Sequence, residues 1–196
     1  MVKSKLLLSQ CLLWIAFLSC LTACTQQVRS LSAADQRLPN EAKQNIADAE
    51  DAVLIAQSRV QDAQNQLEQI QAKHIKFQQS PPKLGPALQV AGQLYSAQVS
   101  FAQLELEYAT TNLALSRARL SLVYAQTSMR YDIAVYDLAP LNLAVKATQK
   151  RLLKLRKDKK LAQSKMKEIT EQWWTAYQAL AKSSGTQGFW VHEFQN

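Results

Sequence analysis

Glycine and proline are scarce in this sequence. The 196 residues include only 4 glycines and 5 prolines, whereas average usage gives these two residue types roughly 12% of positions. Because tight turns depend on them, their scarcity argues against β-barrels, β-sandwiches and loop-rich disulfide scaffolds. The apolar residues, 47% of the chain, are mostly alanine and leucine, which favour helices. The composition therefore predicts one domain of long helices.

Cysteine and the usual motifs of catalysis are missing from most of the chain. The 3 cysteines, Cys11, Cys20 and Cys24, lie near the N-terminus, so the remainder has no thiol for a disulfide, a metal site or a nucleophile. No glycine-rich phosphate loop, zinc-ligand spacing or serine elbow occurs. Glu105 and Glu107 lie two positions apart, so they point in different directions on a helix. We predict a protein that is not an enzyme and that binds no metal, cofactor or small-molecule substrate.

The first 24 residues have the three-part layout of a secretory signal peptide. Lys3 and Lys5 precede an apolar run from Leu6 to Leu21, and small residues follow that run. The run is short for a helix that spans a bilayer. We therefore interpret residues 1–23 as a signal peptide that is removed from the mature chain.

The stretch Leu21-Thr22-Ala23-Cys24 resembles the lipobox of bacterial lipoprotein precursors. The resemblance covers this segment alone and implies cleavage between Ala23 and Cys24, with diacylglycerol on the Cys24 sulfur and an N-acyl chain such as palmitate. Several acyl chains anchor a protein more firmly than one. Thr25 stands where lipoproteins kept in the inner membrane often carry Asp, so the resemblance favours the outer membrane and a periplasmic orientation. A plainly cleaved signal peptide and a retained membrane anchor are the alternatives.

Three stretches of heptad repeats follow residues 24–38, a polar segment that we interpret as a tether between lipid and fold. Apolar residues recur at alternating steps of three and four, which predicts helices at about 40–79, 87–136 and 141–182. The seam of the first helix is Ala42, Ile46, Ala49, Val53, Ala56, Val60, Ala63, Leu67, Ile70, His74 and Phe77. The middle helix has a first seam, Ala87, Val90, Leu94, Ala97, Phe101, Leu104, Tyr108, Thr111, Leu115, Ala118, Leu122, Ala125 and Met129, and a second seam, Tyr95, Val99, Ala102, Leu106, Ala109, Leu113, Ser116, Leu120 and Val123. The seam of the third helix is Leu141, Val145, Thr148, Leu152, Leu155, Lys159, Ala162, Met166, Ile169, Trp173, Ala176 and Leu180.

The helices are separated by two breaks. Residues 80–86, SPPKLGP, end the first helix because proline cannot continue a helix past its first turn. Around Pro140 the heptad register fails, which predicts a turn or a sharp kink between Tyr136 and Leu141.

These patterns predict an all-α fold, a long antiparallel three-helix coiled-coil bundle that spans residues 39–183. The middle helix carries two seams and would therefore lie against both of the others. At 1.5 Å per residue the rod would be about 60 to 70 Å long. A helical hairpin or kinked rod completed by oligomerisation is the alternative.

Basic residues concentrate on the third predicted helix, in a chain whose formal net charge is +8. The candidates for binding an anionic partner are Lys146, Lys150, Lys154, Lys157 and Lys160. One interpretation pairs the helix, within one chain or between protomers, with acidic residues at the parallel end of the first helix, namely Glu41, Asp48, Glu50 and Asp51. The other is a contact with an anionic envelope polymer, lipid head groups or an acidic protein. Nucleic acid is not expected, because the basic stretch lacks interleaved aromatic residues.

Aromatic residues collect toward the C-terminus. Trp173, Trp174 and Tyr177 lie near the end of the third predicted helix, and Phe189, Trp190 and Phe194 lie in a tail, residues 184–196. They either cap the open end of the bundle or form a docking patch for a partner protein.

The lipobox, the long heptads and the missing catalytic groups together predict an outer-membrane-anchored periplasmic coiled-coil lipoprotein. We expect a structural or assembly component of a multiprotein envelope complex of the secretion, conjugation, motility or efflux type. Its expected partners are the membrane, through the lipid anchor, and another protein or further copies of itself. The alternative is an envelope binding module whose basic third helix holds an anionic ligand such as peptidoglycan, lipopolysaccharide or acidic lipid.

Overall fold

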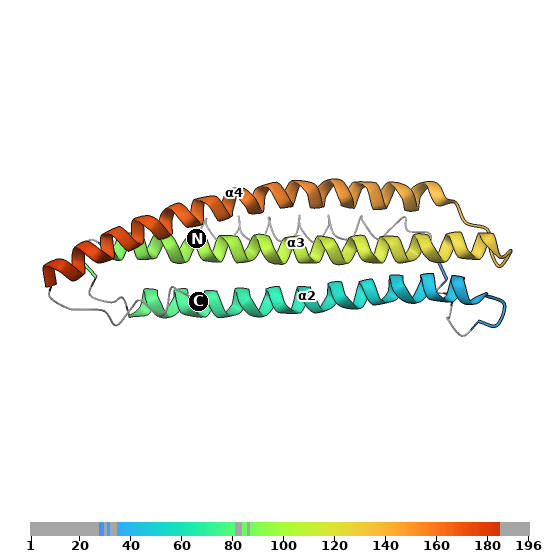
Figure 1. Cartoon of the computed structure of the whole chain (residues 1–196), viewed down its shortest axis with the longest axis horizontal. Coiled ribbons are helices and arrows are strands. Elements are labelled where there is room, and N and C mark those ends of the chain that lie inside the picture. The colour runs from blue at the N-terminus through green and yellow to red at the C-terminus, as the bar shows by residue number, and fades with distance from the viewer. Residues whose placement is uncertain (1–27, 30, 32–34, 81–83, 86, 185–196) are drawn as a thin grey trace, which may run out of the picture.

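The protein is an all-α three-helix bundle, as the heptads predicted. A computed structural model describes residues 28–29, 31, 35–80, 84–85 and 87–184. Within these residues the elements are α2 (Asn40–Gln79), α3 (Ala87–Arg130) and α4 (Leu138–Ser184). Successive helices run in opposite directions, so that α2 and α4 are parallel to each other (Figure 1).

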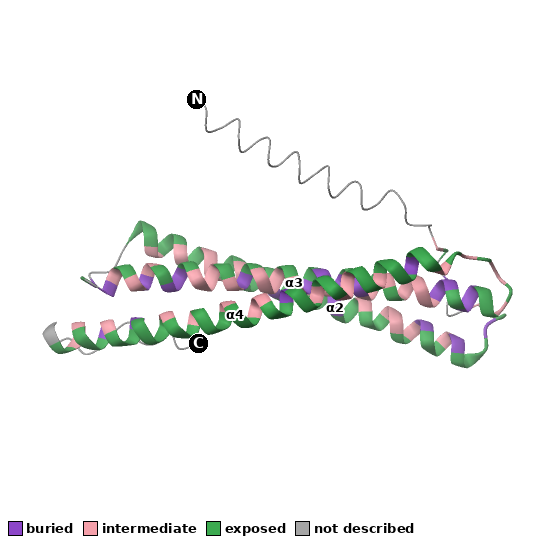
Figure 2. Ribbon diagram, turned by 90° about the horizontal axis from the view of Figure 1, so that it is seen from above, coloured by how far each residue is buried: buried purple, intermediate pink, exposed green. Residues whose placement is uncertain are grey.

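The three helices form a twisted layer with α3 in the centre. Helix α3 packs against both α2 and α4, whereas no Cα atom of α2 comes within 8 Å of one in α4. The two outer helices flank α3 along its length (Figure 1), and seen from above the ribbons overlap near the middle of the rod because the helices are inclined to one another (Figure 2). Helix α4 is therefore one edge of the layer, and its outer side is not covered by α2 or α3.

The two seams of α3 explain this arrangement. Phe101 and Tyr108 of the first seam lie beside Lys159 of α4, and Tyr95 of the second seam contacts α2. At about 100° per residue the two seams lie roughly 150° apart around α3, which places its neighbours on nearly opposite sides. Every predicted seam residue is buried or half-buried except Met129, which is 38% exposed at the end of α3.

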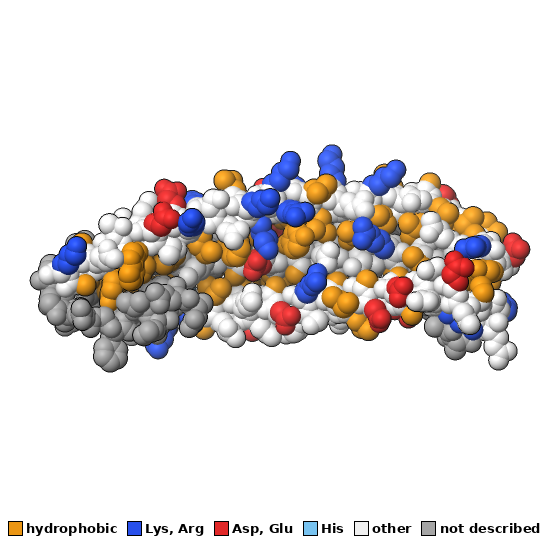
Figure 3. Space-filling model, in the orientation of Figure 1, with side chains coloured by type: hydrophobic (Ala, Val, Ile, Leu, Met, Phe, Trp, Pro, Cys, Tyr) orange, Lys and Arg blue, Asp and Glu red, His pale blue; other side chains and the backbone are white. Residues whose placement is uncertain are grey.

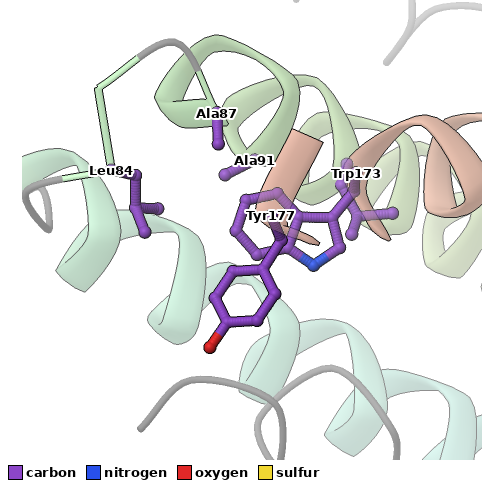
Figure 4. Close-up of a cluster of buried hydrophobic side chains, with 6 residues drawn as sticks. Leu84, Ala87, Ala91, Trp173 and Tyr177 are labelled. Carbon is purple, nitrogen blue, oxygen red and sulfur yellow. The ribbon is translucent and has the colours of Figure 1, made fainter. Parts of the chain in front are cut away.

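One end of the rod is closed by aromatic and aliphatic side chains. Trp173 and Tyr177 of α4 reach across to Ala87 and Ala91 at the start of α3, and Leu84 of the α2–α3 connection joins them (Figure 4). Trp173 is 4% exposed and Tyr177 is 9% exposed. Because large aromatic side chains bury much apolar surface, this cluster fixes the register of α4 against α3.

The opposite end is closed by residues from the expected tether. Leu31 and Leu38 are buried against Ile46 of α2 and Tyr124 of α3. Hydrogen bonds from the Arg37 side chain and backbone lower the pKa of the Asp35 carboxyl to about 2. The described part of residues 24–38 is thus packed on the bundle and does not run free of it, because its leucines cover the end of the core.

The break before α4 is a turn, and it lies earlier than the sequence predicted. Helix α3 ends at Arg130 and not near residue 136, and α4 begins at Leu138 and not at residue 141. Asp132 has a φ of 52°, and the Asp137 carboxylate accepts a hydrogen bond from the Ala139 N–H, as an N-cap does. Pro140 lies within the first turn of α4, where backbone N–H groups have no partner in the helix, so proline is tolerated there.

Candidate interaction surfaces

The basic residues singled out in the sequence share the outer side of α4. Lys146, Lys150, Lys154, Lys157 and Lys160 are all exposed, and their spacing of three or four residues places them on one side of the helix. Figure 3 shows blue Lys and Arg side chains along α4, with orange hydrophobic side chains among them. We call these five lysines the α4 basic face.

The α4 basic face has no acidic partner in the described part of the chain. The described ion pairs are Arg37–Asp35, Arg151–Glu107 and Lys159–Glu105, and none includes one of these five lysines. One interpretation of the sequence paired α4 with Glu41, Asp48, Glu50 and Asp51 of α2. In the structure the paired cations of α4, Arg151 and Lys159, contact α3, and the backbones of α2 and α4 do not approach each other closely. Glu50 accepts a hydrogen bond from the Tyr124 hydroxyl at 2.6 Å.

Exposed leucines lie among these lysines, a feature that the heptad analysis missed. Leu143 is 69% exposed, Leu153 is 61% exposed and Leu161 is 74% exposed. They fall outside the seam of α4 and on the side of the basic face, since each lies three or four residues from one of its lysines. A helical wheel of α4 could have identified them as apolar residues with no helix to cover them.

Lys159 and Glu105 form a part-buried polar contact between α3 and α4. The Lys159 Nζ donates a hydrogen bond to Glu105 Oε1 at 2.7 Å, and both side chains are about one-third exposed, at 29% and 30%. The same ammonium lies 5.7 Å from the Phe101 ring centroid and 5.2 Å from that of Tyr108, within the range of cation–π attraction. A lysine on a seam is accommodated here because it has both an anion and aromatic faces.

The predicted aromatic docking residues have different surroundings. Trp173 and Tyr177 belong to the core, so they are not free to dock a partner. Trp174 is 43% exposed and stacks on Tyr177, with ring centroids 6.0 Å apart. Phe189, Trp190 and Phe194 lie outside the described residues, as do Ala23 and Cys24 of the lipobox.

A groove with both polar and apolar side chains lies across α3, between the C-terminal parts of α2 and α4. Its volume is about 920 Å³, and it is lined by amide and hydroxyl side chains including Gln78, Gln93 and Ser96. His74 borders the groove, where it stacks on Tyr95 and shares a 3.2 Å hydrogen bond with Gln78. Among the residues that the structure describes, no cluster of His, Cys, Asp and Glu side chains could hold a metal ion.

No family model, curated protein or solved structure matches this chain. In the described ranges, no helix has both the length and the apolarity that crossing a bilayer requires. The interaction surfaces must therefore be interpreted from their own chemistry.

Proposed function

We propose that the protein is an outer-membrane-anchored periplasmic coiled-coil lipoprotein that acts as a structural or assembly component of a multiprotein envelope complex. Examples of such complexes are secretion, conjugation, motility and efflux machines. The observation that carries the proposal is a rod of three helices of 40, 44 and 47 residues, about 60 to 70 Å long, whose two outer helices expose long lateral surfaces. Such a rod can hold a partner at a fixed distance from a membrane.

The anchoring step rests on the lipobox. Cys24 would carry the diacylglycerol and an N-acyl chain, and no other cofactor is proposed. The α2–α3 end of the rod would then project away from the lipid, because Cys24 precedes α2 and Val28, Leu31 and Leu38 pack at the opposite end. Trp174 lies near that projecting end, on a surface where a partner protein can reach it.

Affinity purification tests the assembly role. A tag inserted beside Val135, which is 90% exposed in the turn before α4, leaves both chain termini unaltered. We expect the tagged protein, extracted from envelopes in mild detergent, to bring down the same envelope proteins in a fixed ratio by quantitative mass spectrometry. A Trp174→Ala variant should lose part of this partner set, whereas Leu54→Ala, on the outer side of α2, should retain it. Recovery of the chain alone, or only of further copies of itself, would contradict the assembly role.

A second candidate function is supported by the unpaired α4 basic face. Five exposed lysines without carboxylate partners in the described residues form a surface that attracts anions. The protein would then be an envelope binding module whose α4 holds an anionic ligand such as peptidoglycan, lipopolysaccharide or acidic lipid. The two functions differ in their partner, which is a protein in the first and an anionic ligand in the second.

A further inference from the structure

We propose that the outer side of α4 docks on the surface of an anionic lipid bilayer. The docking surface is the α4 basic face together with Leu143, Leu153 and Leu161, and we call this set the basic–leucine face. The proposal rests on the second candidate function, the anionic binding module, and names its ligand class. It does not depend on the lipid anchor at Cys24.

The charge of this face suits lipid head groups. Lysines close to an anionic membrane are attracted within about one Debye length, roughly 8 to 10 Å at physiological salt. The five lysines of the face extend over about 21 Å of helix, from Lys146 to Lys160, at 1.5 Å per residue. A row of this length can contact several head groups at once, since the lysines are exposed and make no described ion pair.

The leucines distinguish a bilayer from the other anionic ligands. A polysaccharide or a peptidoglycan strand offers charge and hydroxyl groups, and it gives exposed leucines little to bind. A helix with lysines and leucines on one side can place the apolar side chains about 5 to 10 Å into the boundary between head groups and acyl chains. Leu153 and Leu161, which are 61% and 74% exposed, already project from α4 without any rearrangement of the fold.

The fold also limits where the bilayer can lie. Because α4 is an edge of the layer, the rod can rest on that side without contact from α2 or α3 (Figure 1). The basic–leucine face lies in the N-terminal half of α4. Beyond Lys160 the exposed charges are mixed, since Glu168 and Glu171 lie beside Lys165 and Lys167. Between Leu143 and Leu161 no acidic residue is exposed, so the proposed contact lies in the part of α4 nearest the start of α2.

A site-specific probe tests the docking in the protein as purified from envelopes. Leu161→Cys and Ile75→Cys, the second on α2 at a position that is 52% exposed, are each labelled with an environment-sensitive dye. The labelled proteins are reconstituted into phosphatidylcholine vesicles with or without phosphatidylglycerol, each containing brominated lipid as a quencher. We expect a blue shift and quenching at position 161 in the anionic vesicles, a loss of both at high salt, and neither signal at position 75.

Two matched variants separate charge from apolar contact. Replacing Lys150, Lys154, Lys157 and Lys160 with Gln should abolish the quenching at position 161, whereas replacing the exposed Arg59, Lys73, Lys76 and Lys182 with Gln should leave it nearly unchanged. Leu153→Gln should reduce the blue shift although every charge is kept. Circular dichroism verifies that each variant remains helical.

Three results would overturn the proposal. The first is an equal blue shift and quenching at position 161 in neutral and anionic vesicles, and the second is neither signal in either kind of vesicle. The third is salt-sensitive retention by isolated peptidoglycan without quenching by anionic vesicles. The last result would leave the anionic binding module intact with a polymer as its ligand. The lipid anchor is tested separately by flotation of the protein with neutral vesicles, because binding to neutral vesicles depends on the acyl chains and not on the basic–leucine face.

Discussion

At the scale of single residues, Lys159 was the least expected member of the predicted seams. The heptad pattern placed it between helices, but the sequence could not identify its partner, because the relative register of α3 and α4 depends on packing along both helices. The structure pairs it with Glu105 and lays it beside the rings of Phe101 and Tyr108. A polar contact of this kind favours one register over those that would leave the lysine unpaired.

We predict that Lys159 and Glu105 are energetically coupled. Glu105→Gln should lower the free energy of unfolding by about 1 kcal/mol, because the half-buried ammonium loses its anion. Lys159→Met should cost little, since a flexible apolar side chain can fill the same space against the rings. A double-mutant cycle by urea unfolding should give a coupling of about 1 kcal/mol for this pair.

The Arg151–Glu107 pair is the internal control for that cycle. It joins the same two helices, but its side chains are more exposed, at 59% and 45%. Its coupling should be smaller, about 0.5 kcal/mol or less, because solvent screens exposed ion pairs. Equal couplings for the two pairs would show that the position of Lys159 on the seam has no special energetic role.

At the scale of elements, the seams predicted the helices well and the connections poorly. Helix α2 has the predicted bounds, Asn40–Gln79, whereas the turn before α4 was predicted too late in the chain. Heptad spacing is set by packing along a helix, but an end is set by local capping, here by Asp137 and the φ of Asp132. The packing of Leu31 and Leu38 was missed because two isolated leucines form no period.

The docking of α2 on α3 should depend on pH through Tyr124. Burial first, and then the hydrogen bond to Glu50, raise the pKa of the Tyr124 hydroxyl to about 12. The unfolded chain, with a tyrosine pKa near 10, releases this proton at lower pH than the folded chain. The stabilisation is therefore fully present below about pH 10 and is lost as the pH rises from about 10 to 12.

Urea unfolding of the wild type and of Tyr124→Phe over this range measures the effect. Other tyrosines and lysines also titrate there, so the informative quantity is the difference between the two proteins. The wild type should lose stability more steeply, by up to about 1.4 kcal/mol per pH unit for one group. Parallel pH profiles for the two proteins would mean that the hydroxyl is not held by this contact.

At the scale of the whole molecule, the sequence predicted the class of fold and its three long helices but not the shape of the layer. The two seams of α3 lie far apart around that helix, so α2 and α4 occupy its opposite sides and the seams are covered within one chain. The lysines of the α4 basic face were recognised in the sequence because basic residues concentrate on the third predicted helix. The leucines among them were not, because a search for seams passes over apolar residues outside the period. Function is harder to predict than fold, because an exposed surface indicates the chemistry of its partner but does not identify that partner.

The intact mass of the protein purified from bacterial envelopes tests the anchored rod most directly. We predict a chain that begins at Cys24 and carries the added mass of diacylglycerol and one N-acyl chain. Cys24→Ser should abolish this mass and the incorporation of labelled palmitate, whereas Cys20→Ser, in the segment predicted to be removed, should leave both unchanged. A chain that begins at Cys24 or elsewhere without acyl groups, or one that retains residues 1–23, would contradict the account.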